Sequence, residues 1–390
     1  MRTLMSAVDL MKVLVSFDTT SRNSNLELIS FIQNYLANFS IESELVHDET
    51  GQKANLYATL GPPDRPGVML SGHTDVVPVD GQEWSTNPFK VIEKDQRLYG
   101  RGTCDMKGFV SIVLAHVPEF LNRRLKTPIH LAFSYDEEVG CIGVQRLIAA
   151  INNKKVKPKL CIVGEPTEMN VVIAHKGKTS FHCRVKGSEA HSSLAPEAVN
   201  AVEFAAELIS HIKSIARRIK TVGPFDPLFD IPHTTIHTGN IRGGTALNIV
   251  PKECDFEFEI RHLPEESSDL YMNEIRDFIN QKLEPEMKSL SAEAGFEFSI
   301  KSAMPGLHTD PDDSVVSFAK SLTGKNNHGK VSFGTEAGPF QQTAGIPTVV
   351  CGPGSIAQAH KPDEFIALEQ MAKCINFMDR LAESACVEMQ

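Results

Sequence analysis

The sequence predicts an α/β protein with a second, inserted α+β domain, and three observations support this prediction. The chain has 390 residues, which suits two domains of ordinary size. Short apolar runs alternate with helix-length segments in the first half of the chain and again near its end. Between these two parts, the alternation changes to a different order of strands and helices.

The alternating part predicts a sheet whose central strands are buried on both faces. Continuous apolar runs of a few residues are typical of strands that helices cover from both sides. We assign this domain to residues 1–177 plus 304–390. The runs that predict its central strands lie at residues 68–70, 129–133, 160–163 and 347–350.

The middle of the chain, residues 178–303, predicts a separate domain with the element order βαββαβ. Alternating apolar residues at Phe181, Cys183 and Val185 indicate its first strand. This order is that of the ferredoxin-like α+β domains. The later elements are expected near residues 198–219 (helix), 234–241 and 254–260 (strands), 270–283 (helix) and 296–300 (strand).

Composition excludes some classes of function. Hydrophobic residues make up 41% and charged residues 23%, which is typical of a folded protein with a large core. Lys+Arg 39 against Asp+Glu 49 gives a net charge of -10, which argues against nucleic acid as a partner. The chain shows neither a signal peptide nor an apolar run approaching a membrane span, so we expect a cytoplasmic protein without membrane contact.

Two features of the sequence carry no functional prediction. The 8 cysteines occur singly, without C-x-x-C spacing, and predict reduced, mostly buried thiols. A lysine-rich segment around Asn153 predicts a solvated loop. Its lysines are Lys154, Lys155, Lys157 and Lys159.

Histidines and acids follow each of the predicted central strands. In open α/β sheets, ligands bind beyond the carboxyl ends of the strands, where these residues would meet. Each one alone is more often a surface residue or a helix cap, but the joint pattern favours a functional site. The residues are His73 and Asp75, Glu137 and Glu138, Glu165, His360, and Asp105 ahead of an apolar helix.

The types of these residues predict a site for two divalent metal ions. Two neighbouring dications repel each other strongly and need several negative ligands. Mixed imidazole and carboxylate ligation suits zinc best, with cobalt also possible. Glu137 then remains as a general base beside Glu138, and Asp75 can orient the imidazole of His73. The predicted ligands are His73, Asp105, Glu138, Glu165 and His360.

These segments together resemble the M20 family of metallopeptidases and deacylases over nearly the whole chain. The resemblance implies a zinc-peptidase-like catalytic domain in which Asp105 bridges the two metal ions. It implies that Glu138 and His360 complete one metal site and that His73 and Glu165 complete the other. It also implies a cis peptide bond after Asp105. The motifs are SGHTDVVP (71–78), GRGTCDMKG (100–108), DEEVG (136–140), GEPT (164–167) and AHKPDE (359–364).

The resemblance further implies that the inserted domain is a lid and dimerisation domain. His191 would then reach the active site of the other subunit in a homodimer and stabilise the oxyanion. Asn248 matches a substrate-facing residue of the family. Arg261 could hold an α-carboxylate or form a salt bridge within the lid, and both readings stay open.

Two glycine-containing loops, 334–338 and 352–360, are similar to the subgroup of the family that acts on N2-acetyl-L-ornithine. This likeness implies hydrolysis to L-ornithine and acetate, a step in arginine biosynthesis. The side-chain ammonium of ornithine needs an anionic partner, so our hypothesis is that Glu336 selects the cationic side chain; the alternative is a solvated loop acid. A succinyl-diaminopimelate desuccinylase and a general N-acyl-amino-acid aminoacylase are the alternatives within the family. A metal-stabilised binding protein without turnover is the non-enzyme alternative, although an acid such as Glu137 has no use there.

Overall fold

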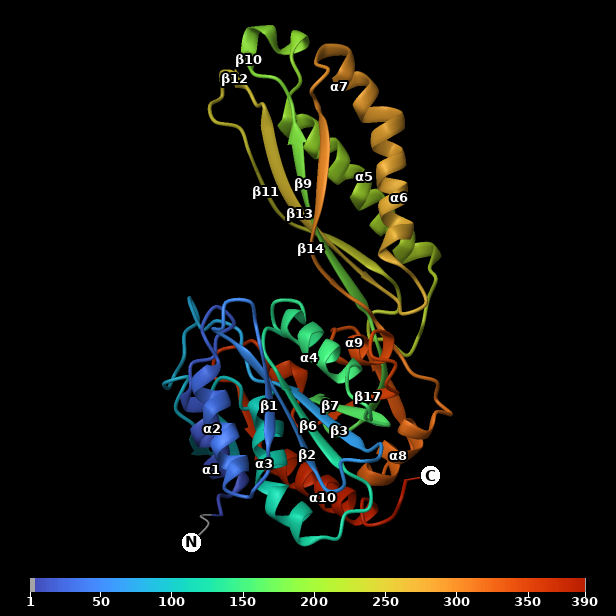
Figure 1. Cartoon of the computed structure of the whole chain (residues 1–390). Coiled ribbons are helices and arrows are strands. Elements are labelled where there is room, and N and C mark those ends of the chain that lie inside the picture. The colour runs from blue at the N-terminus through green and yellow to red at the C-terminus, as the bar shows by residue number, and fades with distance from the viewer. Residues whose placement is uncertain (1–3, 390) are drawn as a thin grey trace. The chain divides into compact units, whose positions relative to one another are not determined.

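The computed structural model of the chain describes residues 4–389, which form two compact units (Figure 1). Unit 1 consists of Met1–Ala174, Leu307–Lys330 and Thr335–Gln390. Unit 2 consists of His175–Gly306 and Val331–Gly334. Because unit 2 interrupts the chain of unit 1, unit 1 is assembled from segments far apart in the sequence.

Unit 1 contains a 9-stranded mixed sheet with the strand order β1-β2-β6-β3-β7-β17-β8-β15. The ninth strand, β16, also pairs with β8. The neighbours β6, β3, β7 and β17 are parallel and fully buried, which confirms the predicted central strands. The sheet extends beyond them on both sides. Its strands are β1 (Ser43–His47), β2 (Ala54–Leu60), β3 (Val68–His73), β6 (Ile129–Ser134), β7 (Leu160–Pro166), β8 (Val171–His175), β15 (Leu307–His308), β16 (His328–Val331) and β17 (Thr348–Gly352).

Helices cover both faces of this sheet (Figure 1). The helices α4 (Ile142–Asn152) and α9 (Ala337–Gln342) contact strands on one face. On the other face, five helices share one hydrophobic core with the sheet. These are α1 (Ala7–Ser16), α2 (Leu26–Ala37), α3 (Lys107–Asn122), α8 (Ser314–Thr323) and α10 (Leu368–Ser384). A small sheet of β4 (Ile92–Lys94), β5 (Arg97–Tyr99) and β18 (Phe365–Ala367) completes the unit.

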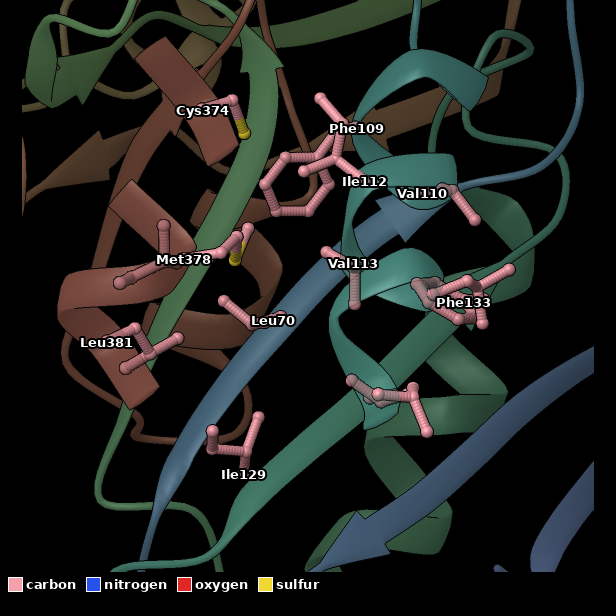
Figure 2. Close-up of a cluster of buried hydrophobic side chains, with 14 of the residues drawn as sticks. Leu70, Phe109, Val110, Ile112, Val113, Ile129, Phe133, Cys374, Met378 and Leu381 are labelled. Carbon is pink, nitrogen blue, oxygen red and sulfur yellow. The ribbon is translucent and has the colours of Figure 1, made fainter. Parts of the chain in front are cut away.

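Helix α3 lies at the centre of this core, between β3, β6 and α10 (Figure 2). All its residues from Lys107 to Leu114 are buried, so the helix is apolar on nearly every side. Phe109 and Ile112 pack with Leu70 of β3 and Met378 of α10 in one buried cluster. Each buried side chain of this size stabilises the fold by roughly 1.5–3 kcal/mol. The first turn of α3, which follows Asp105, is therefore fixed by the core.

Unit 2 contains a 4-stranded antiparallel sheet in the order β11-β13-β9-β14. With its helices, the chain order is βαββαβ, which confirms the ferredoxin-like α+β prediction. The helix α6 continues through a π-helical turn, Ile279–Leu283, into α7 (Glu284–Leu290). The elements are β9 (Gly177–Lys186), α5 (Ala201–Val222), β11 (Thr235–Gly243), β13 (Glu253–His262), α6 (Ser268–Phe278) and β14 (Gly295–Met304), with a short pair β10 (Ala190–His191) and β12 (Ile249–Val250).

Unit 2 has a hydrophobic core of its own. Along β9, buried and partly exposed residues alternate, so only one face of the sheet packs against helices. Asn200 caps the N-terminus of helix α5, and its side chain accepts hydrogen bonds from the backbone N–H groups of Val202 and Glu203. Its buried residues, including Leu208 and Ile212, recur at helical spacing and face the sheet.

Further structural predictions can be compared with the fold. The peptide bond between Asp105 and Met106 is cis, as the family resemblance implies. All cysteines are free thiols and all but Cys386 are buried, which confirms the prediction of reduced, mostly buried residues. Among residues 4–389, no helix is both long enough and apolar enough to cross a membrane.

Candidate metal centre and active site

The carboxyl edge of the parallel strands gathers the predicted ligands from five segments of unit 1. Parallel strands end at the same edge of a sheet, so residues at or just beyond these ends converge. His73 is the last residue of β3, and Glu165 lies near the end of β7. Glu138 follows β6, His360 follows β17, and Asp105 lies just before α3.

Asp105 lies between the two histidines. Its Oδ1 is 3.0 Å from Nε2 of His73, and its Oδ2 is 3.3 Å from Nε2 of His360. On the first side, Oε1 of Glu165 is 3.7 Å from Nε2 of His73. On the second side, Oε2 of Glu138 is 3.0 Å from Nε2 of His360. The two carboxylate oxygens of Asp105 thus face two different groups of ligands, which is how a bridging carboxylate acts.

Asp75 connects two of the ligand-bearing segments. Its backbone oxygen is 2.9 Å from Nδ1 of His73, and its carboxylate oxygen Oδ1 is 3.5 Å from the same nitrogen. Its carboxylate also accepts hydrogen bonds from the backbone N–H of Glu137 at 3.1 Å and of Glu138 at 3.3 Å. The hydroxyl of Ser21 donates to it at 2.7 Å. Asp75 therefore positions the His73 ring and the segment after β6 together.

Glu364, for which no role was predicted from the sequence, holds the segment that carries Asp105. Its Oε1 accepts backbone N–H groups of Gly102, Cys104 and Asp105 at 3.0, 2.9 and 3.0 Å. Its Oε2 accepts a hydrogen bond from Arg101 at 2.6 Å. The only sequence indication was its place in the motif 359–364, shared with His360.

Arg101 extends this network toward His360. The guanidinium donates from Nη2 to Oε1 of Gln82 at 2.7 Å, and Nε2 of Gln82 donates to the backbone oxygen of His360 at 3.0 Å. The guanidinium carbon lies 5.1 Å from the ring centre of Trp84. His360 is the exposed ligand, with 52% of its side chain accessible, so this backbone contact supports a residue that the core does not surround.

Buried acids dominate the electrostatics of the centre. Burial, together with neighbouring carboxylates, raises the pKa of Glu165 well above its usual value and raises the pKa of Glu138 to about 7. Hydrogen bonds with Asp105 and Glu138 raise the pKa of His360 to about 10. Burial disfavours the charged form of Asp105, but hydrogen bonds with His360 and His73 outweigh it and lower its pKa. A neighbouring positive charge would stabilise the ionised forms of these acids.

These residues fit divalent metal ions. Ligand atoms of His73, Glu137 and Glu165 lie within 4.8 Å of one another, and so do those of His73, Asp105 and Glu138. Within residues 4–389, neither Glu138 nor Glu165 forms an ion pair with a lysine or arginine. Several buried carboxylates with imidazoles and no basic side chain form a donor set suited to metal ions of the zinc type.

Glu137 lies beside this set and is partly buried. The thiol of Cys141 donates a hydrogen bond to Oε1 of Glu137 at 3.4 Å. Burial, with the charges of Glu138 and Glu336, raises the pKa of Glu137 well above its usual value. The structure thus places the predicted base next to the predicted ligands, and its catalytic role stays a prediction.

Glu336 is fully buried between two strands of the sheet. Its carboxylate accepts hydrogen bonds from Ser71 of β3 at 3.2 Å and from Ser134 of β6. Burial raises the pKa of Glu336 to about 7. These two strands carry His73 and lead to Glu137, so Glu336 lies behind the metal centre, and its predicted contact with a substrate side chain remains to be tested.

The other predicted site residues lie in unit 2. His191 and Asn248 are exposed neighbours: β10 pairs with β12, and the backbone oxygen of Asn248 accepts from Ser192 at 3.0 Å. Arg261 lies at the opposite end of β13 from these residues and forms an ion pair with Glu259 at 2.7 Å. A salt bridge within this domain is one of the two roles expected for Arg261 from the sequence. The substrate contacts predicted for the three residues stay predictions.

The sequence matches a known family and curated proteins along most of its length. The sequence model of peptidase family M20/M25/M40 matches residues 69–384. An acetylornithine deacetylase from Proteus mirabilis is 36% identical over 372 residues, covering 95% of this chain and 92% of the relative. An acetylornithine deacetylase from Edwardsiella ictaluri is 32% identical over 390 residues, covering 98% of both chains.

Solved structures have the same fold. An M20 family metallo-carboxypeptidase from Sulfolobus solfataricus matches with a TM-score of 0.76 at 17% identity, covering 98% of this chain and 100% of that one. A dinuclear metal-binding M20 peptidase from Bacillus subtilis matches with a TM-score of 0.67 at 16% identity, covering 96% of both. At such identities, the likeness concerns the arrangement of the elements.

Proposed function

The chain belongs to the M20 peptidase family, and on this basis we propose that it hydrolyses N2-acetyl-L-ornithine to L-ornithine and acetate. Full-length similarity to acetylornithine deacetylases at 32–36% identity supports this substrate. The observation that carries the hydrolytic chemistry is the position of Asp105 between His73 and His360, with Glu137 beside them. The reaction would be a cytoplasmic step of arginine biosynthesis.

The proposed centre holds two divalent ions, zinc by preference and cobalt as an alternative. Bound there, they would polarise the acetyl carbonyl and make the attacking water more acidic. Asp105 would contact both ions. Each ion would also be held by one further histidine and one further glutamate. The ligand pairs are His73 with Glu165, and Glu138 with His360.

Glu137 would move the proton. Its carboxylate takes a proton from water as the water oxygen bonds to the acetyl carbon, and it then delivers this proton to the departing amine nitrogen as the C–N bond breaks. Asp75 supports this role because it holds the backbone N–H of Glu137 and the ring of His73 at the same time.

The remaining parts of the proposal concern unit 2. Residues 1–177 plus 304–390 form the catalytic domain, and residues 178–303 form a lid and dimerisation domain. In a homodimer, His191 from the second copy of the chain would stabilise the developing oxyanion. Asn248 would face the substrate, and Arg261 would either exchange Glu259 for the α-carboxylate of the substrate or remain paired within the lid.

The test is acetate release by chelator-treated protein before and after addition of zinc or cobalt. Substrates are N2-acetyl-L-ornithine, N-succinyl-diaminopimelate (scored by succinate release) and N-acetyl-L-methionine. Metal-dependent turnover with preference for acetylornithine is the expected result. Metal-dependent turnover with preference for one of the other amides would show that acetylornithine is not the substrate, but it would support the proposed metal-dependent hydrolysis. Absence of turnover on all three, in metal-replete protein, would favour a binding protein.

The role of Glu336 in substrate choice has its own test. Its carboxylate is occupied by Ser71 and Ser134, so an ornithine ammonium would have to compete with these hydroxyls. Glu336→Ala should reduce the preference for acetylornithine over acetylmethionine. If the ratio of the two kcat/KM values stays unchanged, Glu336 supports the strands instead of selecting the side chain.

A further inference from the structure

The segment between β6 and α4 carries Glu137 and closes into a tight turn. The backbone oxygen of Glu137 accepts hydrogen bonds from the N–H groups of Gly140 and Cys141, both at 2.9 Å. The backbone oxygen of Asp136 accepts a hydrogen bond from the N–H of Ile142 at 3.0 Å. The backbone of the turn is therefore held by its own hydrogen bonds, and it brings Cys141 beside Glu137.

The thiol of Cys141 contacts the side chain of Glu137 directly. Cys141 is buried, and its Sγ donates to Oε1 of Glu137 at 3.4 Å. Burial and the charge of Glu137 raise the pKa of this thiol well above its usual value, so the sulfur keeps the proton that it donates. A thiol is a weak donor, but a charged acceptor strengthens the bond. Among residues 4–389, Cys141 is the one hydrogen-bond donor to the Glu137 carboxylate.

The backbone of Cys141 has a conformation that is unusual for a residue with a side chain. Its φ of 55° and ψ of 41° lie in the left-handed region, which glycine adopts without strain. Cys141 is also the N-cap residue of α4, but its side chain makes no capping hydrogen bond to that helix. The thiol is directed to Glu137 instead. A cysteine that neither relaxes the turn nor caps the helix favours a role in holding Glu137.

We propose that Cys141 is a positioning residue for Glu137 in the hydrolytic reaction, an inference that rests on the proposed function. The thiol holds Oε1 of Glu137 in one orientation, and Oε2 then remains to accept a proton from the attacking water. A base that is already oriented does not have to be ordered when the water attacks, so the hydrogen bond raises kcat. Cys141 acts only through Glu137.

Turnover of N2-acetyl-L-ornithine by the metal-replete, full-length protein tests this role. Cys141→Ala removes the donor and keeps a β-carbon on the same backbone, so kcat should fall about tenfold with KM unchanged. The metal content per chain should stay the same, because the backbone hydrogen bonds of the turn remain. Cys141→Ser restores a donor, so most of the lost turnover should return.

Cys374→Ala is the matched control. Cys374 is another buried thiol, in α10 among the apolar side chains of the core (Figure 2). Its loss should lower the stability of the protein without lowering kcat. The proposal is overturned if Cys141→Ala keeps its kcat, or if Cys141→Ser loses as much kcat as Cys141→Ala, because packing would then explain the loss. Loss of metal from Cys141→Ala would also overturn it.

The infrared S–H stretching band measures the hydrogen bond without substrate. The band of Cys141, identified by its disappearance in Cys141→Ala, should lie at lower frequency than that of Cys374. Glu137→Gln replaces the charged acceptor with a weaker, neutral one, so the Cys141 band should move to higher frequency. This measurement separates the two proposals. Absence of turnover with a low-frequency band contradicts the proposed function, whereas turnover with a band at the frequency of Cys374 contradicts the role of Cys141.

Discussion

Among single residues, substitution of Glu137 should reduce catalysis without reducing metal binding. Glu137→Gln removes a base but leaves the predicted ligands, so kcat should fall about 10²–10⁴-fold. The content of zinc or cobalt per chain should stay the same. Glu138→Gln is the comparison, because loss of a predicted ligand should reduce both activity and metal content.

Elemental analysis of the two purified variants decides between the roles. Glu137 lies as close to His73 and Glu165 as a ligand would. If Glu137→Gln loses metal as Glu138→Gln does, Glu137 is a ligand and another group must move the proton.

His130 should make the protein less stable in mild acid. The pKa of His130 is about 4 in the folded chain, against about 6.5 in an unfolded chain. The unfolded state therefore binds the proton more readily than the folded state. The contribution of neutral His130 to the free energy of unfolding is complete above about pH 6.5. It is lost as the pH falls toward 4, and the total loss is about 3 kcal/mol.

Urea unfolding of metal-free protein at pH 7.5 and 5 measures this effect. His130→Gln does not titrate in this range, so the unfolding free energy of the unaltered protein should fall more steeply with acid than that of the variant. All other titrating groups are common to both proteins and cancel in the comparison. Parallel pH dependence of the two proteins would show that His130 is not the cause.

At the scale of elements, the loop before α3 should depend on Glu364. This one carboxylate accepts three backbone N–H groups, of Gly102, Cys104 and Asp105, besides the Arg101 hydrogen bond. Glu364→Gln keeps the size of the side chain but removes the charge, so the loop that carries Asp105 should loosen. We expect metal affinity to fall about 10–100-fold.

Activity measured against free zinc concentration should reveal this loss, with turnover recovering at high zinc. Glu369→Gln, a similar change in the first turn of α10 at a surface ion pair with Lys373, should leave the titration unchanged. Low activity of Glu364→Gln at saturating zinc would instead assign Glu364 a part in the chemistry.

At the scale of the whole molecule, metal binding should stabilise unit 1 and leave unit 2 unaffected. All predicted ligands belong to unit 1, and unit 2 has its own hydrophobic core. A ligand present at about 100 times its Kd stabilises the state that binds it by about 2.7 kcal/mol. Zinc should therefore raise the Tm of the chelated full chain.

A fragment of residues 175–306 should unfold cooperatively, with a Tm that does not respond to zinc. Scanning calorimetry of the full chain and the fragment makes the comparison. A fragment that shows no cooperative transition would mean that unit 2 needs unit 1 to fold.

The central strands, and the histidines and acids at their ends, could be predicted from local patterns in the sequence. Continuous apolar runs such as residues 129–133 are buried on both faces, and that requirement is visible locally. The alternation at Phe181, Cys183 and Val185 likewise predicted β9, because a strand with one buried face alternates. Sequence motifs indicated which residue types would meet at the sheet edge.

The contacts between distant segments could not be predicted from the sequence. The hydrogen bonds of Glu364 join residues about 260 positions apart, and no local pattern distinguishes this acid from a surface one. The lysine-rich loop was expected to be solvated, but Lys154 pairs with Glu44 of β1 and the loop lines a cavity with buried Tyr57 and His130. Local periodicity reports which face of an element is buried; which side chains meet there depends on how distant elements pack.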